Sequence, residues 1–132
     1  MTEVRVPVTH ESDVVVVRRE VRTLASTLGF SSGELAVIAT AVSEIARNIV
    51  VYAKRGEVVL SLVENGARKG VRVVARDYGP GIPDLSLAMK DGWSTAKGLG
   101  LGLPGARRLM DEFDVVSEVG KGTIVTMTKW SR

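Results

Sequence analysis

Hydrophobic residues at the start of the chain change from a strand period to a helix period. From Glu3 to Thr9 valines alternate with other residues, and this period of two predicts a short edge strand in spite of Pro7. Ser12 then offers a cap for a helix that runs to about Leu28 and is ended by Gly29.

A second helix is predicted directly afterwards. Ser31 and Glu34 have the spacing of a capping box, in which each side chain bonds the backbone N–H of the other residue. Apolar residues then recur at helical spacing to about Lys54. They are Leu35, Ile38, Val42, Ile45 and Ile49.

Two hairpins are predicted in the rest of the chain. Residues 57–64 and 70–77 are rich in strand-forming residues that alternate in character, and residues 113–119 and 122–130 repeat this pattern. The turn residues are Asn65 and Gly66 in the first hairpin, and Gly120 and Gly122 in the second.

The segment between the hairpins is long and rich in glycine and proline. It runs from Tyr78 to Gly105, with one helical turn expected near Leu85 to Lys90 and a helix from Pro104 to about Met110. A loop of this length inside a compact domain is usually functional.

The order of elements is strand, helix, helix, two strands, loop, helix, two strands. Short turns between neighbouring strands favour an α+β fold: a two-layer sandwich in which a mixed, mostly antiparallel sheet carries its helices on one face. The 132 residues are expected to form one domain, 1–132.

Composition narrows the classes of function. The net charge is only +3 and no block of like charges occurs, so no nucleic-acid partner is expected. Cysteine is absent, which excludes disulfides and thiolate chemistry. No unbroken apolar stretch reaches the ~18 residues of a membrane helix, so we expect no membrane partner and a soluble, cytoplasmic protein.

Glu44 and Asn48 form the first candidate constellation. They lie four residues apart on the second predicted helix, and therefore on one face, one turn from each other. A carboxylate and an amide at this spacing could share a magnesium ion and a hydroxyl group. Taken alone, the pair is more often a solvated helix face.

Asp77 is the second candidate. It closes a strand with the parity of the buried residues, so its carboxylate should point to the covered face and needs a hydrogen-bond donor. An exocyclic amine such as that of adenine would serve, and Gly79 and Gly81 would let a flat ring approach the backbone. The alternative is a tight turn in which local N–H groups satisfy Asp77.

Glycines before the third helix form the last constellation. Gly98, Gly100 and Gly102 precede a helix start and could present free N–H groups to phosphates. Gly100, Gly102 and Gly105 also spell GxGxxG, with Glu118 further on. A dinucleotide fold is disfavoured, because no apolar strand precedes these glycines and the helix after them is too short.

In this order the motifs resemble the GHKL superfamily, which has the Bergerat ATP-binding fold. EIARN (Glu44 to Asn48) resembles its N box, DYGPG (Asp77 to Gly81) its first glycine box, GLGLG (Gly98 to Gly102) its second, and Gly122 with Thr123 its late GT element. Longer stretches, such as SEIARNIVVYA and DGWSTAKGLGLGLPGARRLMDEF, are similar to the RsbT-type serine kinases of bacterial stress-signalling complexes.

The resemblance implies a cofactor and a role for each matching residue. ATP and Mg²⁺ would be the cofactors, Glu44 the general base, Asn48 the magnesium ligand, Asp77 the adenine-binding carboxylate beside Gly79 and Gly81, and Thr123 its support through water. The triphosphate would be wrapped by the backbone of Gly98, Leu99, Gly100, Leu101, Gly102 and Leu103. Residues 84–97 would form the ATP lid.

For the RsbT-type kinases, the resemblance implies a partner switch. Such a kinase phosphorylates a STAS-domain antagonist protein and then binds and activates a PP2C-type phosphatase. Two alternatives stay open: an anti-sigma factor with kinase activity that sequesters a sigma subunit, and a fragment of a sensor histidine kinase. His10, the only histidine, lies outside the nucleotide motifs and is interpreted as a surface or capping residue.

Overall fold

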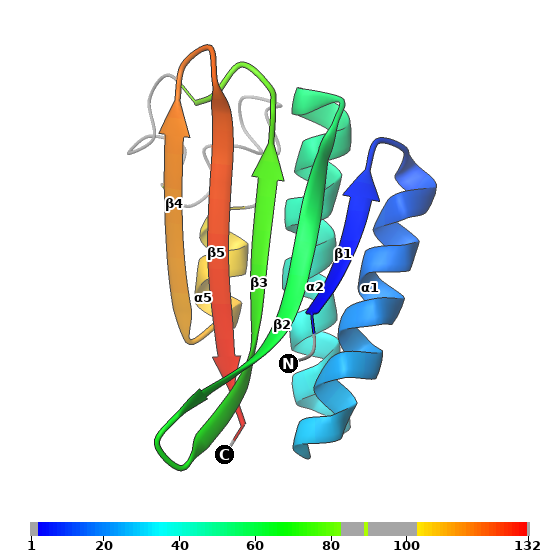
Figure 1. Cartoon of the computed structure of the whole chain (residues 1–132), viewed down its shortest axis with the longest axis vertical. Helices are drawn as coiled ribbons and strands as arrows, with labels where there is room; N and C mark the ends of the chain where they lie inside the picture. Colours follow the sequence, from blue (N-terminus) through cyan, green and yellow to red (C-terminus); the bar gives the residue numbers. More distant parts are fainter. Residues whose placement is uncertain (1–2, 83–88, 90–102, 132) are drawn as a thin grey trace.

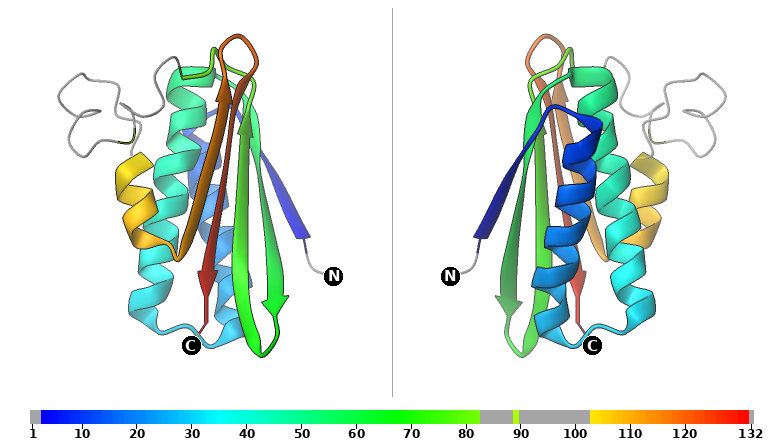
Figure 2. Two further views of the ribbon diagram at one scale, coloured as in Figure 1. Left: turned by 90° about the vertical axis from the view of Figure 1, so that its left-hand side faces the viewer. Right: turned by 90° about the vertical axis from the view of Figure 1, so that its right-hand side faces the viewer.

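The computed structural model describes residues 3–82, 89 and 103–131, which form an α+β fold of two layers (Figures 1 and 2). The sheet has five strands, and the helices all cover one of its faces, as predicted. The elements are β1 Glu3–Val8, α1 Glu11–Ala25, α2 Ser32–Asn48, β2 Gly56–Asn65, β3 Arg68–Asp77, α5 Leu103–Leu109, β4 Glu112–Glu118 and β5 Gly122–Trp130.

The strands pair in the order β1-β2-β3-β5-β4, and every pairing is antiparallel. Both predicted hairpins are therefore confirmed, and the first turns just after Asn65 at Gly66, whose φ is 62°. The described strands pair only antiparallel, which agrees with the expectation that the chain does not contain a parallel dinucleotide-binding unit. The predicted turn near residues 85–90 lies almost entirely outside the described residues.

Helix α1 begins differently from the prediction. Its N-cap is the exposed His10, and Ser12 lies inside the helix, so the proposed Ser12 cap was wrong. Asp13 instead reaches back, and its Oδ2 accepts hydrogen bonds from the N–H groups of Thr9 at 2.9 Å and His10 at 3.0 Å. These two bonds lower the pKa of the Asp13 carboxyl. After α1, a 3₁₀ turn ends at Gly29 as predicted.

Helix α2 begins with the predicted capping box. The Ser31 hydroxyl accepts from the Glu34 N–H at 3.1 Å, and the Glu34 carboxylate accepts from the Ser31 N–H at 3.0 Å. The helix continues into a π-helical segment, Ile49–Ala53, which ends at Lys54 in the left-handed conformation. The predicted end was right, but the wider final turns were not foreseen; such π segments are frequent at functional sites.

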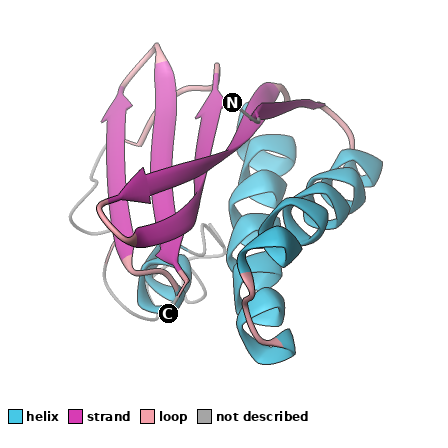
Figure 3. Cartoon of the chain, turned by 60° about the horizontal axis from the view of Figure 1, so that its bottom comes forward, coloured by secondary structure: helices cyan, strands magenta, loops and turns pink. Residues whose placement is uncertain are grey.

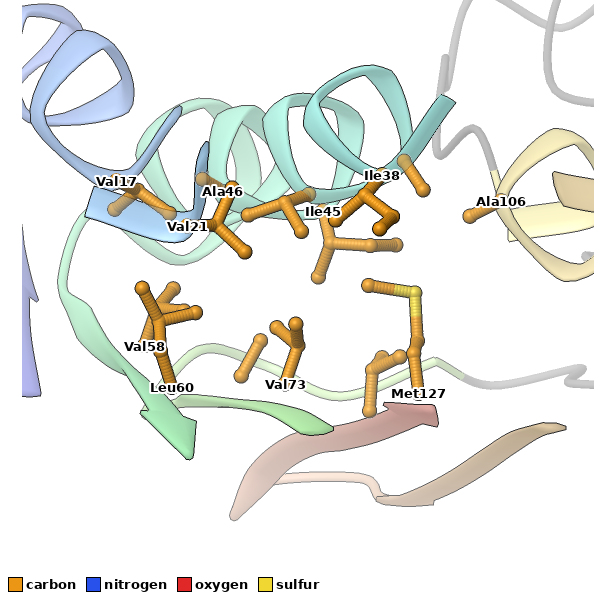
Figure 4. Close-up of a cluster of buried hydrophobic side chains, with 14 of the residues drawn as sticks. Val17, Val21, Ile38, Ile45, Ala46, Val58, Leu60, Val73, Ala106 and Met127 are labelled. Atoms are coloured by element: carbon orange, nitrogen blue, oxygen red, sulfur yellow. The ribbon is translucent and has the colours of Figure 1, made fainter. Parts of the chain in front are cut away.

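The core lies between α1, α2 and the covered face of the sheet (Figure 4). From the helices, Ile38, Val42 and Ile45 are almost fully buried, and Leu60 and Met127 meet them from the sheet. Each such side chain stabilises the fold by about 1.5–3 kcal/mol. This packing fixes α2 against the sheet and thereby fixes the residues at its C-terminal end.

The segment Ser32–Ala53 is long and apolar enough to cross a membrane by length and composition alone, with a mean hydropathy of 1.5. It is not an unbroken apolar stretch, so it does not contradict the expectation from the sequence. Its apolar side chains face the sheet, and Glu44 and Arg47 interrupt its other side. We therefore interpret its hydropathy as that of a core helix.

Three parts of the chain meet at one end of the molecule. The C-terminal end of α2, the C-terminal end of β3 and the β4–β5 turn all lie at the top of Figure 1. The view from below in Figure 3 shows the helices gathered on one side of the sheet. Helix α5 packs beside α2 on that same side (Figure 2).

Candidate nucleotide-binding site

Asp77 is held by backbone N–H groups from two directions. Its Oδ1 accepts a hydrogen bond from the Gly79 N–H at 3.0 Å and another from the Thr123 N–H at 3.1 Å. Oδ2 accepts no hydrogen bond from the part of the chain that the structure describes. The local bond to Gly79 is the one expected of a tight turn, and the bond to Thr123 adds a long-range anchor. One carboxylate oxygen is thus fixed and the other is available.

A polar row continues from Asp77 across the sheet. The register that pairs Arg76 with Ile124 brings Asp77 beside Thr123, and Ser117 lies opposite Thr123. The Ser117 and Thr123 hydroxyls are 2.8 Å apart, and Thr123 is buried. The row therefore lies on the covered face, at the end of the sheet where α2 also ends.

Ser117 is a site residue that the sequence analysis missed. Its Oγ accepts a hydrogen bond from the Ile82 N–H at 2.7 Å and so ties the segment after β3 to β4. Gly120 adds a second tie, because its N–H donates to the Pro80 carbonyl at 2.8 Å. The alternation along β4 could have indicated it, because Phe113 and Val115 face the core and Ser117, two residues further on, is a polar residue on the same face.

Three glycines allow these close approaches. A Cβ at Gly79 would lie 2.6 Å from the Ala53 Cβ, and one at Gly122 would lie 2.2 Å from the Asp77 carbonyl oxygen. Gly81 has a φ of +80°, and a Cβ there would lie 2.4 Å from the Glu118 carbonyl oxygen. The immediate reason for these glycines is therefore packing of β3 against the helix end and the β4–β5 turn. The predicted approach of a flat ring to Gly79 and Gly81 stays a prediction.

Glu44 and Asn48 occupy successive turns at the C-terminal end of α2, as predicted. The Glu44 side chain is 44% exposed, and its Oε1 lies 4.0 Å from Nη1 of Arg47. Arg47 also bonds Glu11 of α1, with 3.2 Å between Nε and Oε1. Glu44 is therefore accessible from solvent, and it lies next to the Arg47 guanidinium, which also links α2 to α1.

The described residues contain no cluster of three or more acidic or histidine side chains that could hold a metal ion alone. Asn48 would therefore supply at most part of a coordination shell. This fits Mg²⁺ bound with a nucleotide, because such an ion takes one or two protein ligands and completes its shell with phosphate oxygens and water.

Of the residues predicted to bind the triphosphate, the structure describes only Leu103. Leu103 is the first residue of α5 and is buried, and α5 packs against α2. The remaining predicted residues of this motif, Gly98, Leu99, Gly100, Leu101 and Gly102, lie outside the described residues, as does the lid expected at residues 84–97 apart from Met89.

This fold and motif set define an ATP-binding domain. The chain belongs to the histidine kinase-like ATPase family, whose domain model matches residues 6–129. It is 48% identical over 122 residues to the serine/threonine-protein kinase RsbT of Bacillus subtilis strain 168, a match that covers 92% of each protein. The resemblance inferred from the sequence motifs is thereby confirmed.

Anti-sigma F factors are also related to this chain. The factor of Thermoanaerobacter sp. strain X514 is 34% identical over 119 residues, which are 86% of this chain and 82% of that protein. The factor of Geobacillus stearothermophilus is 36% identical over 107 residues, which are 75% of this chain and 71% of that protein.

Proposed function

We propose that this chain is an ATP-dependent protein serine/threonine kinase that acts as a partner switch in a bacterial stress-response or sigma-regulation pathway. It phosphorylates a serine of a STAS-domain antagonist and then binds and activates a PP2C-type phosphatase. The observation that carries the proposal is the 48% identity to the kinase RsbT along 92% of both proteins. The protein is proposed to work in the cytoplasm.

The hydrogen bonds that hold one oxygen of the Asp77 carboxylate support a role for Asp77 in adenine recognition. Because Gly79 and Thr123 fix Oδ1, Oδ2 keeps a defined direction and can accept a hydrogen bond from an exocyclic amine. In this proposal Thr123 supports the base through water, and Gly79 and Gly81 leave its approach free of side chains. Asn48 helps to hold Mg²⁺, and the backbone from Gly98 to Leu103 binds the triphosphate.

Glu44 is proposed as the general base of the transfer step. ATP with Mg²⁺ supplies the phosphoryl group and neutralises the charge that develops on it. The protein has to position the acceptor serine and take its proton, and an exposed carboxylate on a rigid helix suits that role. Its place one turn before Asn48 puts base and metal ligand on the same face of α2.

The switch follows from the charge of the product. A phosphate adds about −1.5 to −2 charges at a formerly neutral hydroxyl of the kinase–antagonist interface. The added charge disrupts packing and desolvation there, so the antagonist dissociates after phosphorylation. The released kinase can then bind its second partner through the same or an overlapping surface.

The alternative is an anti-sigma factor with kinase activity that sequesters a sigma subunit. The identities of 34% and 36% to anti-sigma F factors favour this as the second candidate.

Affinity capture from a lysate of the native organism, with the tagged wild-type protein as bait, separates the two functions. Recovery of a STAS-domain protein and a PP2C-type phosphatase supports the switch, and recovery of a sigma subunit supports the alternative. Size-exclusion chromatography of the STAS-domain complex before and after addition of Mg·ATP then tests release directly. A complex that becomes phosphorylated and stays intact contradicts the switch.

A further inference from the structure

The open face of the sheet carries an exposed apolar group at the end where the nucleotide residues lie. Among the described residues five large hydrophobic side chains are exposed, and three of them belong to the sheet layer at this end: Tyr78 at 51%, Val116 at 59% and Val119 at 66%. Val51, at 47%, lies at the same end but belongs to the helix layer. Val116 lies opposite Ile124 on the open face, and Val119 lies in the β4–β5 turn. Clustered exposed apolar side chains of this kind mark interaction sites.

Unpaired positive charge surrounds this apolar group. Arg76 lies opposite Ile124 in the sheet and is exposed, and the Arg55 guanidinium lies 5.5 Å from the centre of the Tyr78 ring. Neither arginine forms an ion pair with a carboxylate of the described residues. We call this set the Tyr78 surface: Arg55, Arg76, Tyr78, Val116, Val119 and Ile124.

Most acidic residues near the Tyr78 surface are already engaged, but Asp114, two residues before Val116 on the open face, is exposed and has no ion pair among the described residues. Glu57, opposite Arg76, is paired with Arg5 of β1. Glu118 is 3.5 Å from Lys121, and Asp77 faces the opposite side of the sheet with its Oδ1 bonded. The Tyr78 surface therefore presents net positive charge around an apolar centre.

We propose that the Tyr78 surface binds a partner protein through a segment in which carboxylates flank a bulky apolar side chain. Tyrosine and arginine are the residue types that dominate binding energy at protein interfaces, and opposite charges at the rim guide the encounter. A second copy of this chain is disfavoured, because a symmetric contact would place two patches of the same positive charge in one interface. Nucleic acid is disfavoured by the valines, since its binding surfaces are more polar.

This surface is distinct from the proposed catalytic side. Alternate residues of β3 face opposite sides of the sheet, so Arg76 is on the open face and Asp77 on the face covered by α2. The inference does not depend on kinase activity, and a partner could occupy the Tyr78 surface without touching Glu44 or Asn48.

The test uses the peptide EDLFDE as a defined probe, added to the ¹⁵N-labelled full chain and followed by amide NMR. We expect saturable shifts at residues 76–78, 116–119 and 124 at millimolar peptide, the range of a weak contact. The peptides KKLFKK, which reverses the charge, and EDAADE, which removes the apolar centre, should bind far more weakly. No saturable shift at these residues would overturn the proposal.

Charge reversal provides the matched comparison. Arg55→Glu with Arg76→Glu should weaken EDLFDE binding about tenfold or more. Arg19→Glu with Arg22→Glu makes the same change of charge on the exposed side of α1 and should leave binding unchanged. If the first variant fails to fold, Arg55→Gln with Arg76→Gln takes its place. Equal weakening by the α1 variant, or displacement of the peptide by a short poly-dT oligonucleotide, would overturn the proposal.

Discussion

The substitution Asp77→Asn tests nucleotide binding without disturbing the fold, because it replaces only the carboxylate oxygen that no described residue bonds. An asparagine can keep Oδ1 as the acceptor for the N–H groups of Gly79 and Thr123, which lie at 3.0 Å and 3.1 Å. Its amide nitrogen then replaces Oδ2 and presents a donor where the adenine amine also presents a donor. The fold should therefore be retained while the contact to the base is lost.

The expected loss follows from the charge of the acceptor. A hydrogen bond to a charged group contributes about 1.5–3 kcal/mol, which corresponds to a ten- to hundredfold weaker affinity for ATP. Isothermal titration calorimetry with Mg·ATP measures this loss, and a thermal melt should give nearly the wild-type midpoint.

Asp77→Ala is the matched control. It removes the acceptor of both N–H groups and should lower the free energy of unfolding by about 2–4 kcal/mol. An Asp77→Asn protein that is folded and binds ATP with unchanged affinity would refute the assignment of Asp77 to the adenine amine.

Three other predictions concern catalysis, backbone geometry and pH. Glu44→Gln should bind ATP normally and transfer phosphate at least about a hundredfold more slowly in a single-turnover assay; a wild-type rate would exclude the base role. Gly122→Ala should destabilise the fold by at least about 2 kcal/mol in urea, because φ is +119° and the new Cβ would meet the Asp77 carbonyl oxygen at 2.2 Å; Gly120→Ala, with open space around it, should cost less. The pKa of the Asp13 carboxyl is lowered from its ordinary value of 3.8, so the ionised carboxylate stabilises the fold above pH 3.8. This stabilisation is lost as pH falls through the lowered pKa. Asp13→Ala should therefore destabilise the protein at neutral pH and not at pH values below both pKa values.

Local signals predicted most of the secondary structure. The capping box of Ser31 and Glu34 and the turn at Gly66 depend on residues within a few positions of each other, and both are confirmed. The cap of α1 was wrong although it is also local, because a side chain at N3, Asp13, took the role expected of Ser12. Such competition between neighbouring polar residues is not decided by residue type alone.

The candidate site was predictable in its motifs and less so in its contacts. Asp77 was found because its parity and the following glycines mark a buried carboxylate. Its anchor on Thr123 and the tie between Ser117 and Ile82 depend on the register of β3, β5 and β4. These two contacts join residues 46 and 35 positions apart. They depend on the pairing of β3 with β5, which no short turn connects, so alternation indicated the face of each residue but not its partner.

Transfer of phosphate to a protein serine is the central claim, and mass spectrometry tests it most directly. The purified protein is incubated with Mg·ATP and a candidate STAS-domain antagonist, and the antagonist is then analysed intact and after proteolysis. The account predicts one added phosphoryl group on a serine of the antagonist, absent when Glu44→Gln replaces the wild type. An antagonist that stays unmodified while the wild-type protein binds both ATP and the antagonist would contradict the account.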